Sequence, residues 1–185
     1  MFFKEYIEHV RRENPTWKSN SRIIGRACEL YCCNNIKCLN CNSLNWLECV
    51  TNEKSKDQIC KTCNKQYQIK CKNITPKQYN KIKSTIKFKT IGAEYNTTLK
   101  SLDNNIDYLI ILYDKTYFVL DILHVRDTDI TSENVIPRKK LSENARRAGW
   151  QGCYLYFNKF KYVLNQECDD TSNKVLQRDT VYAIL

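Results

Sequence analysis

Two cysteine pairs constrain this chain more than any other feature of its sequence. Two residues separate Cys38 from Cys41 and Cys60 from Cys63, in the pattern C-x2-C-x18-C-x2-C. This spacing is typical of sites in which four thiolates hold one tetrahedral Zn²⁺. Because four sulfur ligands leave no open coordination position, we expect a structural zinc ion in a polar zinc ribbon at about residues 36–66.

The chain has 11 cysteines in all. The N-terminus lacks the layout of a signal peptide, so we expect an intracellular, cytoplasmic protein with reduced thiols. Cys33 is a possible substitute zinc ligand with a poorer spacing. Most of the cysteines outside the two pairs are interpreted as small core residues: Cys28, Cys32, Cys33, Cys49, Cys71, Cys153 and Cys168.

Length and charge limit the possible partners. The 185 residues, 42% of them hydrophobic, suffice for one domain, and no apolar run is long enough to cross a membrane. The net charge of +10 favours a polyanionic partner, of which nucleic acid is the commonest. A genome rich in Lys, Asn and Ile codons would produce a similar surplus without such a partner.

Hydrophobic periodicity indicates an α/β fold, with a mixed central sheet flanked by helices. A strictly alternating strand is predicted over residues 67–72, and a continuous apolar run over 108–113 predicts a central strand buried on both faces. Ser19 or Ser21 is a suitable N-cap for the second helix. Helices or helical turns are predicted at about 2–13, 22–31, from 75–76 onward, 92–102 and 141–149, and further strands at 117–123, 152–157 and 162–164.

A second pattern accompanies the cysteines. Asp57 lies just before the second pair, and Gln68-Ile69-Lys70 follows that pair. Strand alternation places Gln68 and Lys70 on one face. Asp57 would lie on the adjacent strand, with the 60–63 knuckle as the turn between the two strands. A carboxylate, an amide oxygen and a lysine suit metal-assisted phosphodiester hydrolysis. A solvated polar strand face explains the same residues, and the motif alone favours that simpler interpretation.

A third segment combines Arg146, Arg147, Gly149 and Trp150. Arginine can bind phosphate or guanine, tryptophan can stack on bases, and glycine allows close approach of the backbone. Solvated arginines at a helix end beside a core tryptophan are an equally good interpretation of the residues. Lys139 and Lys140, just upstream, would add phosphate contacts. His9 and His124 are interpreted as unpartnered structural or surface residues.

These segments together resemble the catalytic domain of the DpnI-type, or Dam-replacing, restriction endonucleases of the PD-(D/E)XK superfamily. The resemblance covers roughly residues 15–165. Residues 17–21 resemble the entry to the first core helix, and the cysteine pairs match the family's zinc ribbon. Asp57 corresponds to the metal-binding aspartate, and Gln68-Ile69-Lys70 stands where the family has Glu-x-Lys. The most specific match is residues 141–153.

The resemblance implies a restriction-endonuclease-like fold with an inserted zinc ribbon, in a single nuclease domain over residues 1–185. It also implies a Mg²⁺-dependent type II endodeoxyribonuclease of a restriction-modification system, acting on double-stranded DNA. The target would be a short GATC-like site, whose adenine methylation stays open. By the same resemblance Asp57, Gln68 and the Ile69 carbonyl bind Mg²⁺, and Lys70 assists attack by water. The residues that would contact DNA are Lys139, Lys140, Arg146, Arg147 and Trp150.

Two departures from the family pattern are visible. The chain is too short to hold the C-terminal winged-helix domain of the family's reference member. Gln68 replaces a glutamate, and because an amide carries no charge, Mg²⁺ should bind more weakly. A zinc-ribbon DNA-binding protein with a weakened or inactive nuclease site is therefore the main alternative. A zinc-ribbon RNA-binding protein is another, and a monomer and a homodimer are both open.

Overall fold

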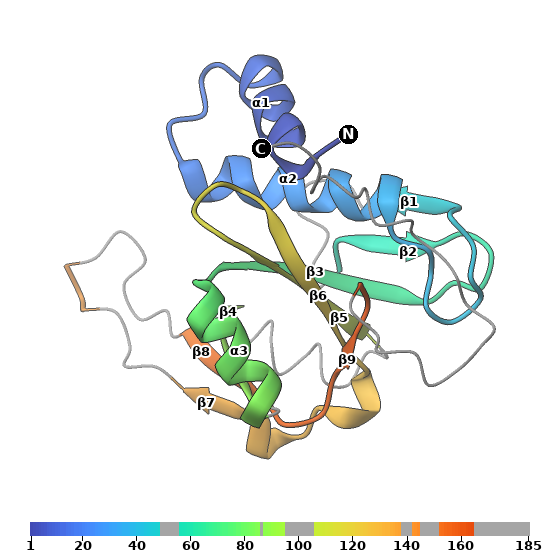
Figure 1. The fold of residues 1–185 in the computed structure, drawn as a ribbon, viewed down its shortest axis with the longest axis vertical. Helices are drawn as coiled ribbons and strands as arrows, with labels where there is room; N and C mark the ends of the chain where they lie inside the picture. The colour runs from blue at the N-terminus through green and yellow to red at the C-terminus, as the bar shows by residue number, and fades with distance from the viewer. Residues whose placement is uncertain (49–55, 86, 95–105, 138–141, 145–151, 165–185) are drawn as a thin grey trace, which may run out of the picture.

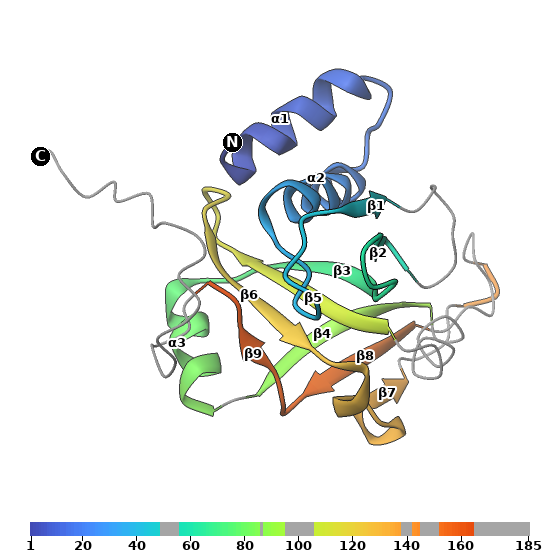
Figure 2. The same cartoon turned by 90° about the vertical axis from the view of Figure 1, so that its right-hand side faces the viewer.

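The computed structural model describes residues 1–48, 56–85, 87–94, 106–137, 142–144 and 152–164. These residues form a layered structure around a six-stranded sheet. Helices α1 (Phe3–Glu13) and α2 (Asn20–Asn35) cover one face of this sheet, and α3 (Pro76–Thr85) and a smaller sheet cover the other (Figures 1 and 2). The predicted α/β, restriction-endonuclease-like architecture is confirmed.

The larger sheet has the strand order β1-β2-β3-β5-β6-β9. Strands β3 and β5 are parallel, and the other neighbours are antiparallel. All eight residues of β5 are buried, which confirms it as the central strand. The strands are β1 (Trp46–Glu48), β2 (Gln58–Cys60), β3 (Gln66–Asn73), β5 (Ile106–Tyr113), β6 (Val119–Val125) and β9 (Lys161–Tyr162).

The smaller sheet is antiparallel, in the order β4-β8-β7. It consists of β4 (Phe88–Glu94), β7 (Val135–Pro137) and β8 (Gly152–Phe157). Two 3₁₀ turns, η1 (Asp127–Asp129) and η2 (Ser132–Asn134), connect β6 of the larger sheet to β7. The chain therefore passes from the central sheet into the second layer directly after β6.

The first two helices form where the periodicity predicts them. Asn14 caps the end of α1 and Pro15 follows it, which prevents continuation of the helix. Ser19 is the N-cap of α2, because its hydroxyl accepts a hydrogen bond from the Arg22 N–H. The second helix begins two residues earlier and ends four residues later than predicted, because its buried stripe continues through Cys32.

Alternation along β5 divides the interior into two cores. Leu109 and Ile111 pack toward α1 and α2, together with Cys28, Cys32 and Tyr67. Tyr108, Ile110 and Leu112 pack toward α3 and β8, together with Ile74, Ile82, Leu155 and Phe157. Burial on both faces explains why β5 is a continuous apolar run instead of an alternating one.

Some predicted helices and strands differ from those in the structure. The helix predicted for 92–102 is wrong at its start, because residues 92–94 belong to β4, and residues 95–105 lie outside the described ranges. Strand β7 was not predicted. The turn predicted at 141–149 is described only at 142–144. Strand β8 is confirmed over its predicted residues, whereas β9 covers only 161–162. Among the described residues, no helix has the length and apolar character needed to cross a membrane.

Candidate active site

The four cysteines of the predicted zinc site converge. Their sulfur atoms all lie within 4.8 Å of one another, with 3.5 Å between Cys38 and Cys63 and 3.4 Å between Cys41 and Cys60. A tetrahedral ion at about 2.3 Å from each sulfur would separate the sulfurs by about 3.8 Å. Disulfide bonds are excluded for these pairs because an S–S bond is only about 2.05 Å long. The cluster thus has the size and the ligands of a structural Zn²⁺ site, and Cys33 is not part of it.

Both knuckles of the cluster use the same backbone device. Asn42 follows Cys41 and Asn64 follows Cys63, and both asparagines adopt left-handed conformations with φ of 60° and 58°. Asparagine tolerates this region better than other non-glycine residues. In each knuckle the asparagine N–H donates to the carbonyl of the first cysteine. The asparagine that follows each C-x2-C pair is therefore a local sequence signal for this turn geometry, in addition to the cysteine spacing.

The second knuckle is the turn between β2 and β3. Strand β2 ends at Cys60, whose N–H donates to the Lys65 carbonyl at 2.9 Å. Strand β3 begins at Gln66. The antiparallel register pairs Gln58 with Tyr67. Asp57 lies one residue before β2, and its N–H also donates to the Tyr67 carbonyl, at 2.9 Å. Two consecutive residues, Asp57 and Gln58, therefore oppose Tyr67.

Asp57 and Gln68 are in contact. The Asp57 carboxylate accepts hydrogen bonds from the Gln68 side-chain amide and, at 2.7 Å, from the Ile69 N–H. Strand β2 begins only at Gln58, so here a side-chain oxygen takes the place of a backbone carbonyl as the acceptor for β3. Together with the hydrogen bond from the Asp57 N–H to the Tyr67 carbonyl, this bond extends the hairpin beyond β2.

The electrostatics of Asp57 reflect this position. Burial raises the pKa of its carboxyl above the usual 3.8, whereas the charge of Lys70 and the hydrogen bonds from Ile69 and Gln68 act in the opposite direction. Lys70 is therefore close enough to act on the carboxylate of Asp57. The structure brings Asp57 and Gln68 into contact directly before β2, and Lys70 lies on the same strand as Gln68, two residues further along.

Strand β3 separates its two faces as the alternation predicts. Tyr67 and Ile69 belong to the core under α2, and Cys71 packs against it. Gln68 and Lys70 are paired across the parallel ladder with Tyr108 and Ile110, which face the second layer. Gln68 is only 7% exposed. The polar trio thus lies at the side of the sheet that carries α3 and β8, away from α1 and α2.

Aromatic side chains connect the cysteine cluster to the same hairpin. The buried Tyr67 hydroxyl lies 3.5 Å from the Cys38 sulfur, and the Tyr67 ring packs edge-on against Trp46. The Trp46 indole N–H donates to the Ile36 carbonyl at 2.7 Å. Since Tyr67 precedes Gln68, the residue on one face of β3 contacts a cysteine of the cluster, while the next residue contacts Asp57.

The interpretation of His124 as unpartnered is wrong. His124 is buried, and its Nε2 lies 2.7 Å from a carboxylate oxygen of Asp107, which is 4% exposed. Lys65 Nζ lies 2.8 Å from the other oxygen of Asp107 and 3.4 Å from Asp127. Burial would raise the pKa of Asp107, but its hydrogen bonds from His124, Lys65 and the Asp127 N–H lower it. His9 is exposed, as expected.

The predicted DNA-contacting segment cannot be placed. Arg146, Arg147, Trp150, Lys139 and Lys140 all lie outside the described residues.

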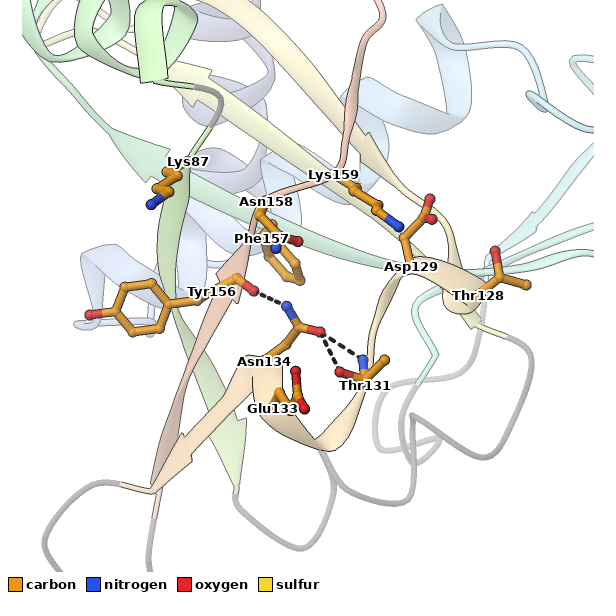
Figure 3. A pocket seen from close by; sticks show the side chains of 10 residues that line it. All are labelled: Lys87, Thr128, Asp129, Thr131, Glu133, Asn134, Tyr156, Phe157, Asn158 and Lys159. Atoms are coloured by element: carbon orange, nitrogen blue, oxygen red, sulfur yellow. Dashed lines mark hydrogen bonds between the residues drawn. The ribbon is translucent and has the colours of Figure 1, made fainter.

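A cavity of about 440 Å³ opens between η1, η2 and β8 (Figure 3). Asn134 connects two sides of the cavity. Its side-chain amide donates to the Tyr156 carbonyl at 2.5 Å, and its side-chain oxygen accepts hydrogen bonds from the Thr131 N–H and hydroxyl. Asp129 and Glu133 also line it. The cavity does not include the polar trio at the β2–β3 hairpin.

Comparison with protein families gives a match over most of the chain. The model of the DpnI, Dam-replacing family matches residues 9–164. The chain belongs to this Dam-replacing family. It is accordingly a DpnI-type restriction enzyme domain, and the family places it among nucleases that act on DNA. Both the cysteine cluster and the polar trio fall inside the matched range.

Proposed function

We propose that this Dam-replacing family protein is a Mg²⁺-dependent type II endodeoxyribonuclease. It hydrolyses phosphodiester bonds of double-stranded DNA at a short GATC-like site, with adenine methylation as the variable to determine. The observation that carries the proposal is the contact between Asp57 and Gln68 at the β2–β3 hairpin, with Lys70 on the same face of β3 and its charge acting on Asp57. A solvated polar strand face, the simpler interpretation, does not explain a buried Gln68 and a carboxyl with a raised pKa.

The donor set fits a hard divalent cation. Asp57 offers a carboxylate, Gln68 offers an amide oxygen and the Ile69 carbonyl completes the set, all of them oxygen ligands of the kind Mg²⁺ prefers. Asp57 and Gln68 already touch through a hydrogen bond, so one ion can reach both side chains. When bound, Mg²⁺ supplies positive charge against the phosphate and promotes ionisation of water.

The chain's own groups supply the remaining functions. The Lys70 ammonium acts on Asp57 through its charge, and from the same face of β3 as Gln68 it can orient the attacking water and offset negative charge that develops on the phosphate. The Ile69 N–H holds the Asp57 carboxylate in place, so the ligand is preorganised by the backbone. Tyr67 and the cysteine cluster fix the strand from its other face.

Plasmid cleavage tests this assignment. Methylated and unmethylated plasmid are incubated with the purified, zinc-loaded protein and Mg²⁺, and the ends of the products are mapped. Asp57→Asn and Lys70→Ala should each lower the rate by at least about a hundredfold. Glu8→Gln and Lys115→Ala, exposed residues outside the site, serve as controls of matched charge change and should cleave normally. Mg²⁺-dependent cleavage that survives either site substitution contradicts the roles given to these residues.

One observation favours the alternative of a DNA-binding zinc-ribbon protein with a weakened nuclease site. The Gln68 amide donates a hydrogen bond to Asp57, whereas a glutamate would add a second negative charge there. Under this alternative the protein binds duplex DNA with the same affinity in the presence and absence of Mg²⁺ and leaves it uncut. The plasmid assay, read together with a binding measurement, separates the two functions.

A further inference from the structure

The polar face of β3 continues beyond the candidate active site. Lys72 follows Lys70 by two residues, about 6.6 Å along a strand, and therefore points to the same face. It pairs in register with Leu112, a member of the core that faces α3. A line of polar side chains thus leads from Asp57 and Gln68 past Lys70 to Lys72 and toward α3.

Lys72 lines a cleft of about 500 Å³ between β3, α3 and β8. Lys81 on α3 and Lys87 just before β4 stand on its rim and are exposed, and Tyr156 of β8 completes the wall. Ile74 and Ile82 form an apolar floor. The three lysines come from three different parts of the chain, so the fold gathers their charges at one place.

The charge of this cleft differs from that of the neighbouring cavity. Its described lining contains three lysines and no acidic residue, whereas the cavity in Figure 3 includes Asp129 and Glu133. Lys87 and Tyr156 line both spaces, and Figure 3 shows their side chains extending away from Asn134. An anion near this wall therefore finds the more favourable potential on the side of Lys72 and Lys81.

We infer that this cleft binds the sugar-phosphate backbone of duplex DNA next to the phosphate held at Asp57 and Lys70. This inference rests on the proposed function, because it takes the polar trio as the point of cleavage. Lysines are point charges that suit phosphate oxygens without reading sequence. The apolar floor and the half-exposed Tyr156 ring suit the less polar deoxyribose edge of the strand. The cleft sets the direction in which the DNA leaves the active site, and its contacts add affinity that is independent of sequence.

The test compares two double variants with the same change in charge. Lys81→Gln/Lys87→Gln removes the exposed rim of the cleft, and Lys4→Gln/Lys115→Gln removes two exposed lysines elsewhere, on α1 and in the β5–β6 turn. Binding of a short fluorescent DNA duplex is measured by anisotropy at several salt concentrations, in buffer without Mg²⁺ so that no cleavage occurs. Thermal unfolding verifies that both variants are folded.

The association constant K for DNA falls with salt, and each lost phosphate contact should reduce the magnitude of the slope of log K against log salt concentration by about 0.9. For the cleft variant, which lacks two lysines, this slope should be smaller in magnitude by about 1.8. If the affinities converge near 1 M salt, this corresponds to roughly 60-fold weaker binding at 0.1 M. The control variant should keep the wild-type slope. With Mg²⁺, the cleft variant should show a raised KM and an unchanged kcat.

The outcomes separate the two proposals. Normal cleavage by the wild type, together with equal slopes for the two double variants, overturns the cleft and leaves the proposed function standing. A wild type that does not cleave, but whose binding weakens selectively in the cleft variant, supports the cleft and overturns the nuclease. Selective loss of binding to RNA, with binding to duplex DNA unchanged, also overturns the inference.

Discussion

Substitutions of Asp57 are predicted to separate stability from activity. Substitution by alanine removes the acceptor of the Ile69 N–H and of the Gln68 amide. A buried donor left without a partner costs about 1–3 kcal/mol. Water reaches part of the vacated space, because Asp57 is only half-buried, and the loss of a buried charge offsets some of the cost. We therefore expect Asp57→Ala to lose about 2 kcal/mol, or about 4–8 °C in Tm for a chain of this size.

Substitution by asparagine should have a different effect. Its side-chain oxygen can accept the same two hydrogen bonds, while the charge that burial disfavours is gone. Asp57→Asn should therefore be at least as stable as the wild type in Mg²⁺-free buffer at neutral pH, and yet inactive. Mg²⁺ at about ten times its Kd should stabilise the wild type by about 1.4 kcal/mol and leave the asparagine variant unchanged.

The pH dependence follows from the raised pKa of Asp57. In the window between the usual value of 3.8 and the raised value, the folded protein binds the proton more tightly than the unfolded chain. Wild-type stability relative to Asp57→Asn should therefore fall as pH rises through this window and stay constant above it. Asp114 is the control of opposite sign, because hydrogen bonds from Thr116 and Phe118 outweigh burial and lower its pKa. Asp114→Asn should destabilise the protein at neutral pH.

Urea unfolding at several pH values measures all of these differences. The reasoning is refuted if Asp57→Asn is as unstable as Asp57→Ala at neutral pH. The negative charge itself would then stabilise the fold, contrary to the cost of its burial. It is equally refuted if Mg²⁺ stabilises the wild type and the asparagine variant to the same extent, because the ion would then bind without the carboxylate.

Three further predictions concern the surroundings of the site. Gln68→Glu should keep or raise the rate of cleavage at low Mg²⁺, because a charged oxygen binds the ion more tightly. Complete loss of cleavage over a Mg²⁺ titration would contradict the assignment of residue 68 as a ligand. Cys60→Ser, or a chelator strong enough to remove Zn²⁺, should release the metal, lower Tm and abolish cleavage together, as followed by zinc content and thermal unfolding; activity in fully zinc-free protein contradicts this coupling. Asp107→Asn should cost about 2 kcal/mol at neutral pH, because Lys65 loses its buried counter-charge and His124 loses a charged hydrogen-bond acceptor. That cost should be full above the usual pKa of 3.8 and should disappear as pH falls through the lowered pKa of Asp107, which urea unfolding can follow.

The hairpin of the site could be predicted from sequence because its determinants are local. The cysteine spacing fixes the turn at residues 60–63, and strict alternation along 67–72 fixes which side chains share a face. Asp57 stands directly before the strand that pairs with β3 and so lies within reach of Gln68. Each step involves residues that are close together in the chain, so periodicity and spacing are sufficient.

Features that depend on distant pairing could not be predicted. Strand β4 contains Gly92-Ala93-Glu94, which has no clear alternation, and it is a strand because it pairs with β8, whose residues follow about sixty positions later. The partner of His124 was missed for the same reason. Lys65 and Asp107 lie at the adjoining ends of the parallel strands β3 and β5, and only the Gln66–Ile106 register brings them together. Local patterns contain no information about that register.

The position of the cysteine cluster suggests what a structural metal would contribute to the proposed nuclease site. Strand β2 has three residues and forms only two register pairs with β3, and so short a hairpin is marginally stable by itself. The knuckle closes one end of this hairpin, and the bond from the Ile69 N–H to Asp57 closes the other. The cysteine knuckle at one end and the hydrogen bond to Asp57 at the other together restrict movement of Asp57 relative to Lys70. Without the ion, the hairpin would be held only by its two register pairs and the hydrogen bonds of Asp57, so its strands would separate more easily. The order of the proposed Mg²⁺ site therefore depends on a metal that takes no part in the chemistry.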